Sequence, residues 1–162
     1  MSTHGSSPRS AQEQARVDEA LRDLCEEKIT FNKTLGLQLE SLGPEGPIVR
    51  FDMRPELVGH YLYGRLHGGV ISATLDLAGG LACMLAQSRK HQNETAEQIL
   101  QRFAKLGTID LRIDYLRPGI GKRFYASALV TRLGGRIGST QMRLESDAGT
   151  IIATGAASYV IS

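Results

Sequence analysis

The sequence predicts an α+β protein in which one antiparallel β-sheet wraps around a single buried helix. The first observation is a long apolar stretch, residues 67–87 (HGGVISATLDLAGGLACMLAQ), whose length and lack of alternating polarity favour a helix buried on most sides. The second is a set of six strand-like segments, two before this helix and four near the C-terminus. A chain of 162 residues with 41% apolar and 22% charged residues has the size and composition of one globular domain, which excludes wholesale disorder.

The N-terminal part of the chain is expected to precede the main domain. Residues 1–29 predict a polar tail followed by an amphipathic helix, and residues 30–162 predict the sheet-forming domain. Ser10 and Glu13 have the spacing of a capping box. They predict a helix over about residues 11–28 with one apolar stripe.

The predicted sheet consists of segments in which apolar and polar residues alternate. A Gly-Pro-rich turn at residues 43–47 joins the first two segments, and Gly134-Gly135 joins a later hairpin. A short helix opens at Thr95, which has capping-box spacing to Gln98, and ends before Gly107. The strand segments are residues 36–42, 48–53, 109–115, 124–132, 137–145 and 150–160.

Charge and cysteine content exclude several classes of protein. The net charge is +2, divided into −3 for residues 1–101 and +5 for residues 102–162. The basic residues 102–162 could form a surface that binds phosphates, or they could belong to a solvated face of the sheet. Because the sequence has no basic run and few aromatic residues, no nucleic-acid partner is expected. The two cysteines, Cys25 and Cys83, are far apart and lack C-x-x-C spacing, so they predict neither a metal site nor a redox site. The low cysteine count and the lack of a visible secretory signal favour a cytoplasmic location. Glycines and Asp76 interrupt the apolar stretch, so no membrane span is expected.

Asp76 is the only acidic residue between Arg65 and Arg89. A carboxylate inside an apolar helix is costly unless it is paired or hydrogen-bonded. Asp76 therefore either lies on a polar edge with a structural hydrogen bond, or faces a cleft as a base or nucleophile.

The segment His67-Gly68-Gly69 opens the same helix. The first N–H groups of a helix lack internal partners and lie at the positive end of its dipole. Without side chains at Gly68 and Gly69, a ligand carbonyl could approach this backbone and be polarised there. The alternative is that the two glycines only form a tight turn into the helix.

The spacing between these two features predicts an oligomer. Gly68 and Asp76 are eight residues apart, which is about 12 Å along a helix. One small carbonyl cannot touch both from the same chain, so joint action requires two subunits and an active site across a symmetric interface. Gly79-Gly80 is consistent with a close approach near that interface.

Several segments together resemble the hotdog-fold acyl-CoA thioesterases of the PaaI group, most closely the YigI-type medium- and long-chain enzymes. The resemblance covers about residues 30–160 and matches the predicted order of elements. It is carried by residues 67–71 (HGGVI), 76–80 (DLAGG), 107–112 (GTIDLR), 114–119 (DYLRPG) and 31–36 (FNK and LG).

The resemblance implies a role for three residues of this chain. The acid at Asp76 acts as general base on water or as nucleophile on the thioester. The backbone N–H at Gly68 binds the thioester oxygen, and His67 helps to set the geometry of the loop. The resemblance also implies sheets that pair edge to edge in a homodimer, dimers that often stack into homotetramers, and no metal or organic cofactor.

The chain departs from the family pattern just before His67. The family commonly has an asparagine six or seven residues before this histidine, where it helps to position the nucleophile or water. His60 and Tyr61 occupy these positions here. Either could hydrogen-bond a water molecule, or His60 could be a solvated loop residue.

Basic residues of the C-terminal half are candidates to bind the phosphates of coenzyme A. Arg117, in the R-P turn, is the first choice, and Arg136 is another. Lys122 and Arg123 could equally form a charged sheet rim. The helix at residues 95–106 could cap the acyl channel or simply fill the gap beside the main helix.

The sequence thus predicts a homo-oligomeric acyl-CoA thioesterase with its active site at a dimer interface. The alternative is a non-catalytic acyl-CoA binding or sensing module on the same fold. A hotdog hydratase or dehydratase is a third possibility and ranks last, because those enzymes use a histidine that is placed differently relative to the acid.

Overall fold

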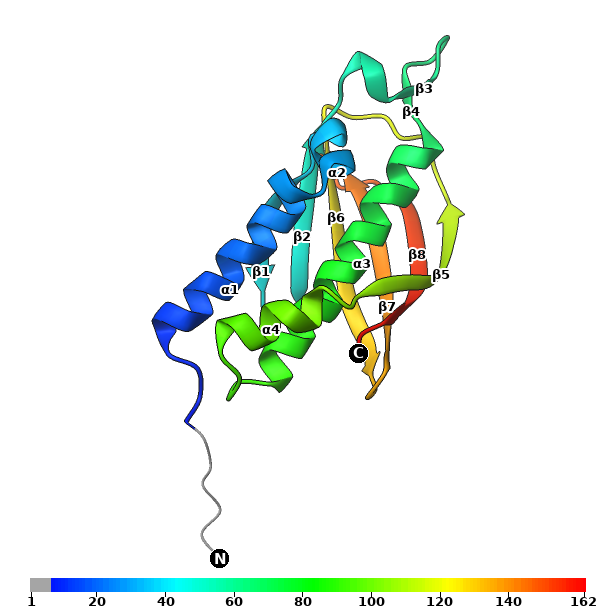
Figure 1. The fold of residues 1–162 in the computed structure, drawn as a ribbon. Coiled ribbons are helices and arrows are strands. Elements are labelled where there is room, and N and C mark those ends of the chain that lie inside the picture. Colours follow the sequence, from blue (N-terminus) through cyan, green and yellow to red (C-terminus); the bar gives the residue numbers. More distant parts are fainter. Residues whose placement is uncertain (1–6) are drawn as a thin grey trace, which may run out of the picture.

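A six-stranded antiparallel sheet wraps around one long helix in the computed structural model, which describes residues 7–162 (Figure 1). The helix is α3 (Gly68–Lys90), and the strands lie in the order β1-β2-β6-β7-β8-β5. This confirms the predicted α+β architecture. The strands are β1 (Gln38–Gly43), β2 (Gly46–Asp52), β5 (Gly107–Tyr115), β6 (Arg123–Leu133), β7 (Ile137–Ser146) and β8 (Ile151–Val160).

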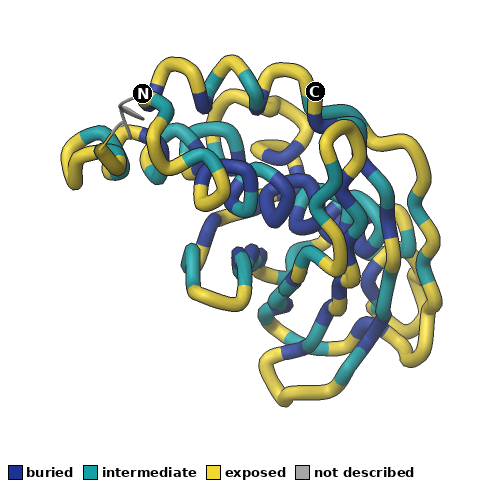
Figure 2. The backbone as a smooth tube through the Cα atoms, turned by 90° about the horizontal axis from the view of Figure 1, so that it is seen from below, coloured by how far each residue is buried: buried dark blue, intermediate teal, exposed yellow. Residues whose placement is uncertain are grey.

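The core lies between α3 and the concave face of the sheet. Leu75 and Ala78 on α3 and Phe124 and Leu144 on the sheet are fully buried there. The tube drawing shows the central helix mostly buried, while exposed or partly exposed residues alternate with buried ones along the strands of the sheet (Figure 2). Helix α3 is long and apolar enough to cross a membrane. However, 67% of its most apolar 18-residue segment is buried inside the fold, as expected for a core helix.

The N-terminal helix packs on the same core. Helix α1 (Ala11–Asp23) continues into a π-helical turn (Leu24–Lys28), so the expected helix over 11–28 is present with a change of geometry at residue 24. Its apolar stripe is buried, because Val17, Leu21 and Cys25 have no exposed surface. Helix α1 lies beside α4 (Ala96–Phe103) (Figure 1).

Part of the expected N-terminal tail is fixed to the fold. Residues 1–6 of that tail lie outside the described residues. The Arg9 guanidinium donates to the Ser88 carbonyl at 2.9 Å and the Glu94 carbonyl at 2.9 Å, and the Arg9 backbone N–H donates to Gln92. Arg9 therefore joins the start of α1 to the end of α3. The expected boundary between residues 29 and 30 remains a prediction.

Two small elements were not predicted from the sequence. Helix α2 (Thr30–Leu35) ends at Gly36, which has a φ of 72°. A separate hairpin of β3 (Val58–His60) and β4 (Arg65–Leu66) follows the 3₁₀ turn Pro55–Leu57 and lies beyond the N-terminal end of α3 (Figure 1). Both elements are shorter than the windows in which periodicity can be detected.

The glycine pair inside α3 serves a contact within one chain. A Cβ on Gly79 would lie 2.2 Å from the Tyr159 hydroxyl and 3.0 Å from Thr140 Oγ1, both on the sheet of the same chain. The close approach at Gly79 is therefore made by the sheet of the same chain, and the nearness of the pair to a second subunit remains a prediction. Its missing side chain lets the sheet reach the helix backbone.

Gly79→Ala is expected to lower the free energy of unfolding by about 1–3 kcal/mol, because overpacking outweighs the gain in helix propensity. Gly80→Ala is the matched control. Its added Cβ would meet Leu106 at 3.5 Å, an ordinary contact, so stability should be unchanged or rise by up to about 1 kcal/mol. Urea unfolding compares the two, and equal effects would contradict this account of Gly79.

Candidate active site

The carboxylate of Asp76 is held by two hydroxyl groups. Its Oδ1 accepts a hydrogen bond from Thr108 Oγ1 at 2.9 Å and one from the Tyr159 hydroxyl at 3.3 Å. The Tyr159 hydroxyl also donates to the backbone carbonyl of Asp76 at 2.9 Å. Among residues 7–162 no hydrogen bond involves Oδ2 of Asp76. One carboxylate oxygen is thus anchored and the other is available.

Tyr159 remains a hydrogen-bond donor because it is buried. Its side chain is 1% exposed at the end of β8. Burial, and next the negative charge of Asp76, raise the pKa of the phenol far above its usual value near 10. The protonated hydroxyl therefore faces Asp76 at any pH the protein meets.

Asp76 borders an apolar cavity of about 270 Å³. Thr108, Tyr159 and Asn32 are the other polar residues in its wall. A cavity of this kind accommodates a small apolar group next to a carboxylate. Its apolar wall comes from the N-terminal helical segment, from α3 and from the approach to β5, and includes Leu24, Ile29, Leu77, Leu81, Met84 and Leu106.

The N-terminus of α3 leaves one backbone donor free. His67 is the N-cap, and its Nδ1 accepts from the Gly69 N–H at 2.8 Å. The N–H groups of Val70 and Ile71 bond to the His67 carbonyl. Within the described chain the Gly68 N–H donates to no group. Of the four N–H groups in the first turn, only that of Gly68 can reach a ligand.

Helix α3 keeps Gly68 and Asp76 apart within one chain. Both residues lie on one continuous helix, with about 12 Å between them along its axis. Strand β5 runs beside them: Thr108 at its start bonds Asp76, and the Tyr115 hydroxyl at its end donates to the Gly68 carbonyl at 3.2 Å. The structure therefore does not bring the two predicted groups together in one protomer.

His60 and Tyr61 lie on the exposed β3–β4 hairpin. The His60 ring stacks on Tyr61, with 5.8 Å between centroids, and also contacts Tyr63 at 4.8 Å. Arg65 covers the Tyr63 ring at 4.6 Å. Tyr61 is 87% exposed. Neither His60 nor Tyr61 lines the cavity beside Asp76 of the same chain.

The two arginines expected to bind phosphates lie at opposite ends of the sheet. Arg117 follows β5 and donates to the Ile151 carbonyl at 3.0 Å, where β8 begins. The Arg136 carbonyl accepts from the Ile161 N–H, beyond the end of β8. Ten residues of strand separate these points, about 33 Å. Arg123 instead pairs with Asp52 at 2.5 Å.

Neither metal chemistry nor thiol chemistry is indicated by the described part of the chain. Residues 7–162 contain no group of three or more His, Cys, Asp or Glu side chains placed to hold a metal ion. Cys25 and Cys83 are buried and unpaired, and burial raises the pKa of each thiol to about 12. A thiol of this pKa is a poor nucleophile near neutral pH.

Comparison with known proteins identifies the family. The sequence model of the thioesterase superfamily matches residues 63–153, which include α3, Asp76, Gly68 and most of the sheet. The chain belongs to the thioesterase superfamily. A medium/long-chain acyl-CoA thioesterase of Escherichia coli, YigI, is 37% identical over 131 residues, which cover 81% of this chain and 84% of that protein.

Solved structures support the same assignment. A protein of Shewanella oneidensis related to the thioesterase superfamily has a TM-score of 0.89 and 36% identity over 94% of this chain and all of its own. A thioesterase of Haemophilus influenzae, 19% identical, has a TM-score of 0.66 over 88% of this chain and 87% of its own, which shows the common fold.

Sequence analysis did not single out two residues of this candidate site. Thr108 lies within the shared segment 107–112, and Tyr159 lies within the predicted strand at residues 150–160. A signal for Tyr159 does exist: it alternates with the small residues Ala153, Gly155 and Ala157 along one face of β8, so a large side chain ends a run of small ones. Which atom it meets depends on Gly79 and on the packing of α3.

Alkaline unfolding tests the buried phenol. The native state keeps the Tyr159 proton above about pH 10, where the unfolded chain loses it, so the unfolded state binds fewer protons and stability falls as pH rises. Tyr159→Phe should make this fall shallower by up to about 1.4 kcal/mol per pH unit. Tyr61→Phe, at an exposed tyrosine, is the control and should keep the wild-type slope. The two buried cysteines contribute equally to the slope in all three proteins. Identical slopes for all three proteins would contradict the burial of a protonated Tyr159.

Proposed function

We propose that this thioesterase hydrolyses medium- and long-chain acyl-CoA to the free acid and coenzyme A, as a homodimer or as a homotetramer formed by two dimers. The observation that carries the proposal is the carboxylate of Asp76, anchored through one oxygen and bordering an apolar cavity. The similarity to a medium/long-chain acyl-CoA thioesterase over most of both chains supports the choice of substrate. Cytoplasmic location and the choice between dimer and tetramer remain predictions.

The thioester oxygen is assigned to the backbone N–H of Gly68 of the partner subunit. A thioester carbonyl is already electrophilic, so a polarising donor and an activated nucleophile are the main requirements. The free N–H lies at the positive end of a 23-residue helix, where developing negative charge is stabilised. The distance along α3 within one chain is why the partner must supply it.

Asp76 is assigned the carboxylate chemistry, by one of two routes. As a general base it takes a proton from water while the oxygen attacks the carbonyl carbon. As a nucleophile, its free oxygen attacks that carbon and forms an anhydride, which water then hydrolyses. In both routes the carbon–sulfur bond breaks and the sulfur leaves as the coenzyme A thiol after it gains a proton.

The coenzyme A phosphates are assigned to Arg117 rather than to Arg136. Arg117 lies two residues after Tyr115, whose hydroxyl donates to the Gly68 carbonyl, so Arg117 and the polarising N–H belong to the same end of one protomer. Arg136, at the other end of the sheet, cannot share that substrate in the same protomer. His67 is assigned to fix the first turn of α3 through the Gly69 N–H.

A non-catalytic acyl-CoA binding module is the rival function. A module that only binds the substrate gains nothing from a carboxylate beside an apolar cavity, since the charge costs desolvation energy without a reaction to perform. The free oxygen of Asp76 therefore favours the enzyme.

Asp76→Asn should lower kcat/KM by about 10²–10⁴-fold, because the amide is neither a base nor a nucleophile. The measurement is coenzyme A release from a series of acyl-CoAs of increasing chain length. Asp18→Asn on α1, where Asp18 accepts from Gln14, removes the same charge away from the cavity and should keep wild-type rates. Binding without turnover by both the wild type and Asp76→Asn would instead support the binding module.

A further inference from the structure

One face of α3 lines two apolar cavities in succession. Gly69 and Val70 border a cavity of about 370 Å³ at the helix N-terminus. Ala73, Asp76 and Leu77, one to two turns further and on the same side, border the cavity beside the carboxylate. The two cavities therefore follow one another along a single helix face rather than lying on opposite sides of it.

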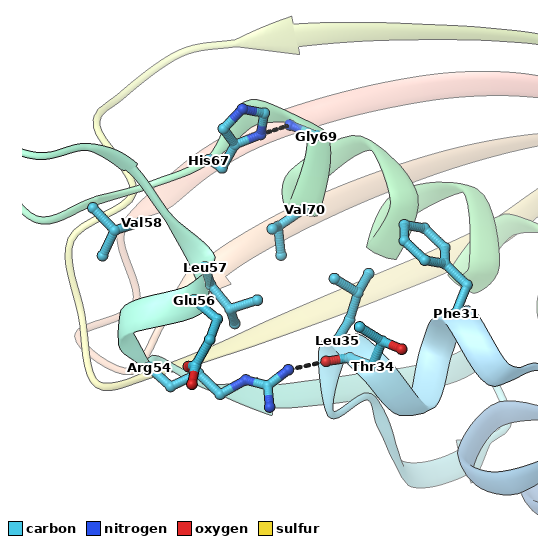
Figure 3. A pocket seen from close by; sticks show the side chains of 10 residues that line it. All are labelled: Phe31, Thr34, Leu35, Arg54, Glu56, Leu57, Val58, His67, Gly69 and Val70. Atoms are coloured by element: carbon cyan, nitrogen blue, oxygen red, sulfur yellow. Dashed lines mark hydrogen bonds between the residues drawn. The ribbon is translucent and has the colours of Figure 1, made fainter.

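Of the residues that the structure describes, Phe31 alone lines both cavities. It extends from α2 toward α3 and stands at the opposite end of the first cavity from Val58 (Figure 3). The walls on either side of it are mostly apolar, with Leu35, Leu57 and Val70 on one side and Leu77 on the other. The Phe31 ring thus divides what would otherwise be a longer apolar groove along α3.

We infer that Phe31 limits the length of the acyl chain that this enzyme hydrolyses, by closing the cavity beside Asp76 on the side of the α3 N-terminus. The inference rests on the proposed function. An acyl tail that starts at Asp76 and lies along α3 meets the Phe31 ring, so further methylenes find no apolar surface. Where they can be buried, each methylene is worth about fourfold in affinity.

The surroundings of Phe31 allow its side chain to change without loss of the helix that carries it. Phe31 is 58% exposed, so it contributes little to the core. Helix α2 is held by the buried Asn32 and Leu35 and by the Arg54 guanidinium, which donates to the Thr34 carbonyl. Truncation of Phe31 should therefore open the groove rather than unfold α2.

The test compares coenzyme A release across the acyl-CoA series for two opposite substitutions. Phe31→Ala should move the preferred chain length upward and raise kcat/KM by about tenfold for the first chains beyond the wild-type optimum. Phe31→Trp should move the preferred length downward or narrow the range. Leu129→Ala, at an exposed leucine on β6, is the matched control and should keep the wild-type profile. Thermal unfolding establishes that all variants are folded.

The outcomes separate the inference from the function on which it rests. A wild type that hydrolyses acyl-CoA, with an optimum that neither Phe31 variant moves, would overturn the role of Phe31 and leave the thioesterase intact. A wild type that hydrolyses no member of the series would overturn the proposed function itself. Opposite shifts in the two variants, with an unchanged control, would establish Phe31 as the residue that sets chain length.

Discussion

The contact between the Tyr159 hydroxyl and Asp76 is the interaction on which the rest of the site depends. It joins the end of β8 to the middle of α3. The helix position that it crosses is Gly79, where any side chain would clash with the Tyr159 hydroxyl. The same hydroxyl supports the backbone carbonyl and one carboxylate oxygen of Asp76. Because the phenol is buried and stays protonated, it fixes the direction of the carboxylate. Thr108, at the start of β5, completes this support from a second strand.

The length and continuity of α3 impose the second constraint. A single unbroken helix carries both the free N–H of Gly68 and the carboxylate of Asp76, and therefore holds them apart. Strand β5, which runs beside the two groups, is an edge strand of the sheet, and within residues 7–162 it pairs with β8 alone. Ile109 and Tyr115 of this strand are more than half exposed. In the proposed dimer, a second copy of the chain pairs along this open, partly apolar strand edge.

The main features of the fold could be predicted from the sequence because they depend on strong local signals. The apolar run gave α3, and the capping pairs at Ser10 and Thr95 mark helix starts that the structure confirms: Ser10 Oγ accepts from the Glu13 N–H, and Thr95 and Gln98 form the reciprocal capping box. The alternating segments correspond to the six strands of the main sheet. Helix α2 and the β3–β4 hairpin could not be predicted, because segments this short show no detectable hydrophobic periodicity.

The site could be predicted only in part, for a physical reason. Asp76 and Gly68 stand out because an acid and a pair of glycines conflict with a buried helix. Thr108 and Tyr159 fit the patterns of their strands and therefore do not stand out in the sequence. Their importance comes from their hydrogen bonds to the Asp76 carboxylate on α3. Phe31 is similar, since its place between two cavities depends on the position of α2. Such residues are defined by tertiary packing, which local pattern does not encode.

The most direct test of a site shared between subunits is the activity of a mixed dimer. One chain carries Asp76→Asn and the other carries Gly68→Pro. Proline removes the backbone N–H, and the first position of a helix tolerates it. The preceding residue, His67, already has the extended backbone that a following proline requires. Gly68→Ala keeps the N–H and is the control. Purified with two different tags, the mixed dimer should regain about half of the wild-type activity, because one of its two sites is intact. Activity no higher than that of the two separate variants, or an active monomer, would contradict the shared site.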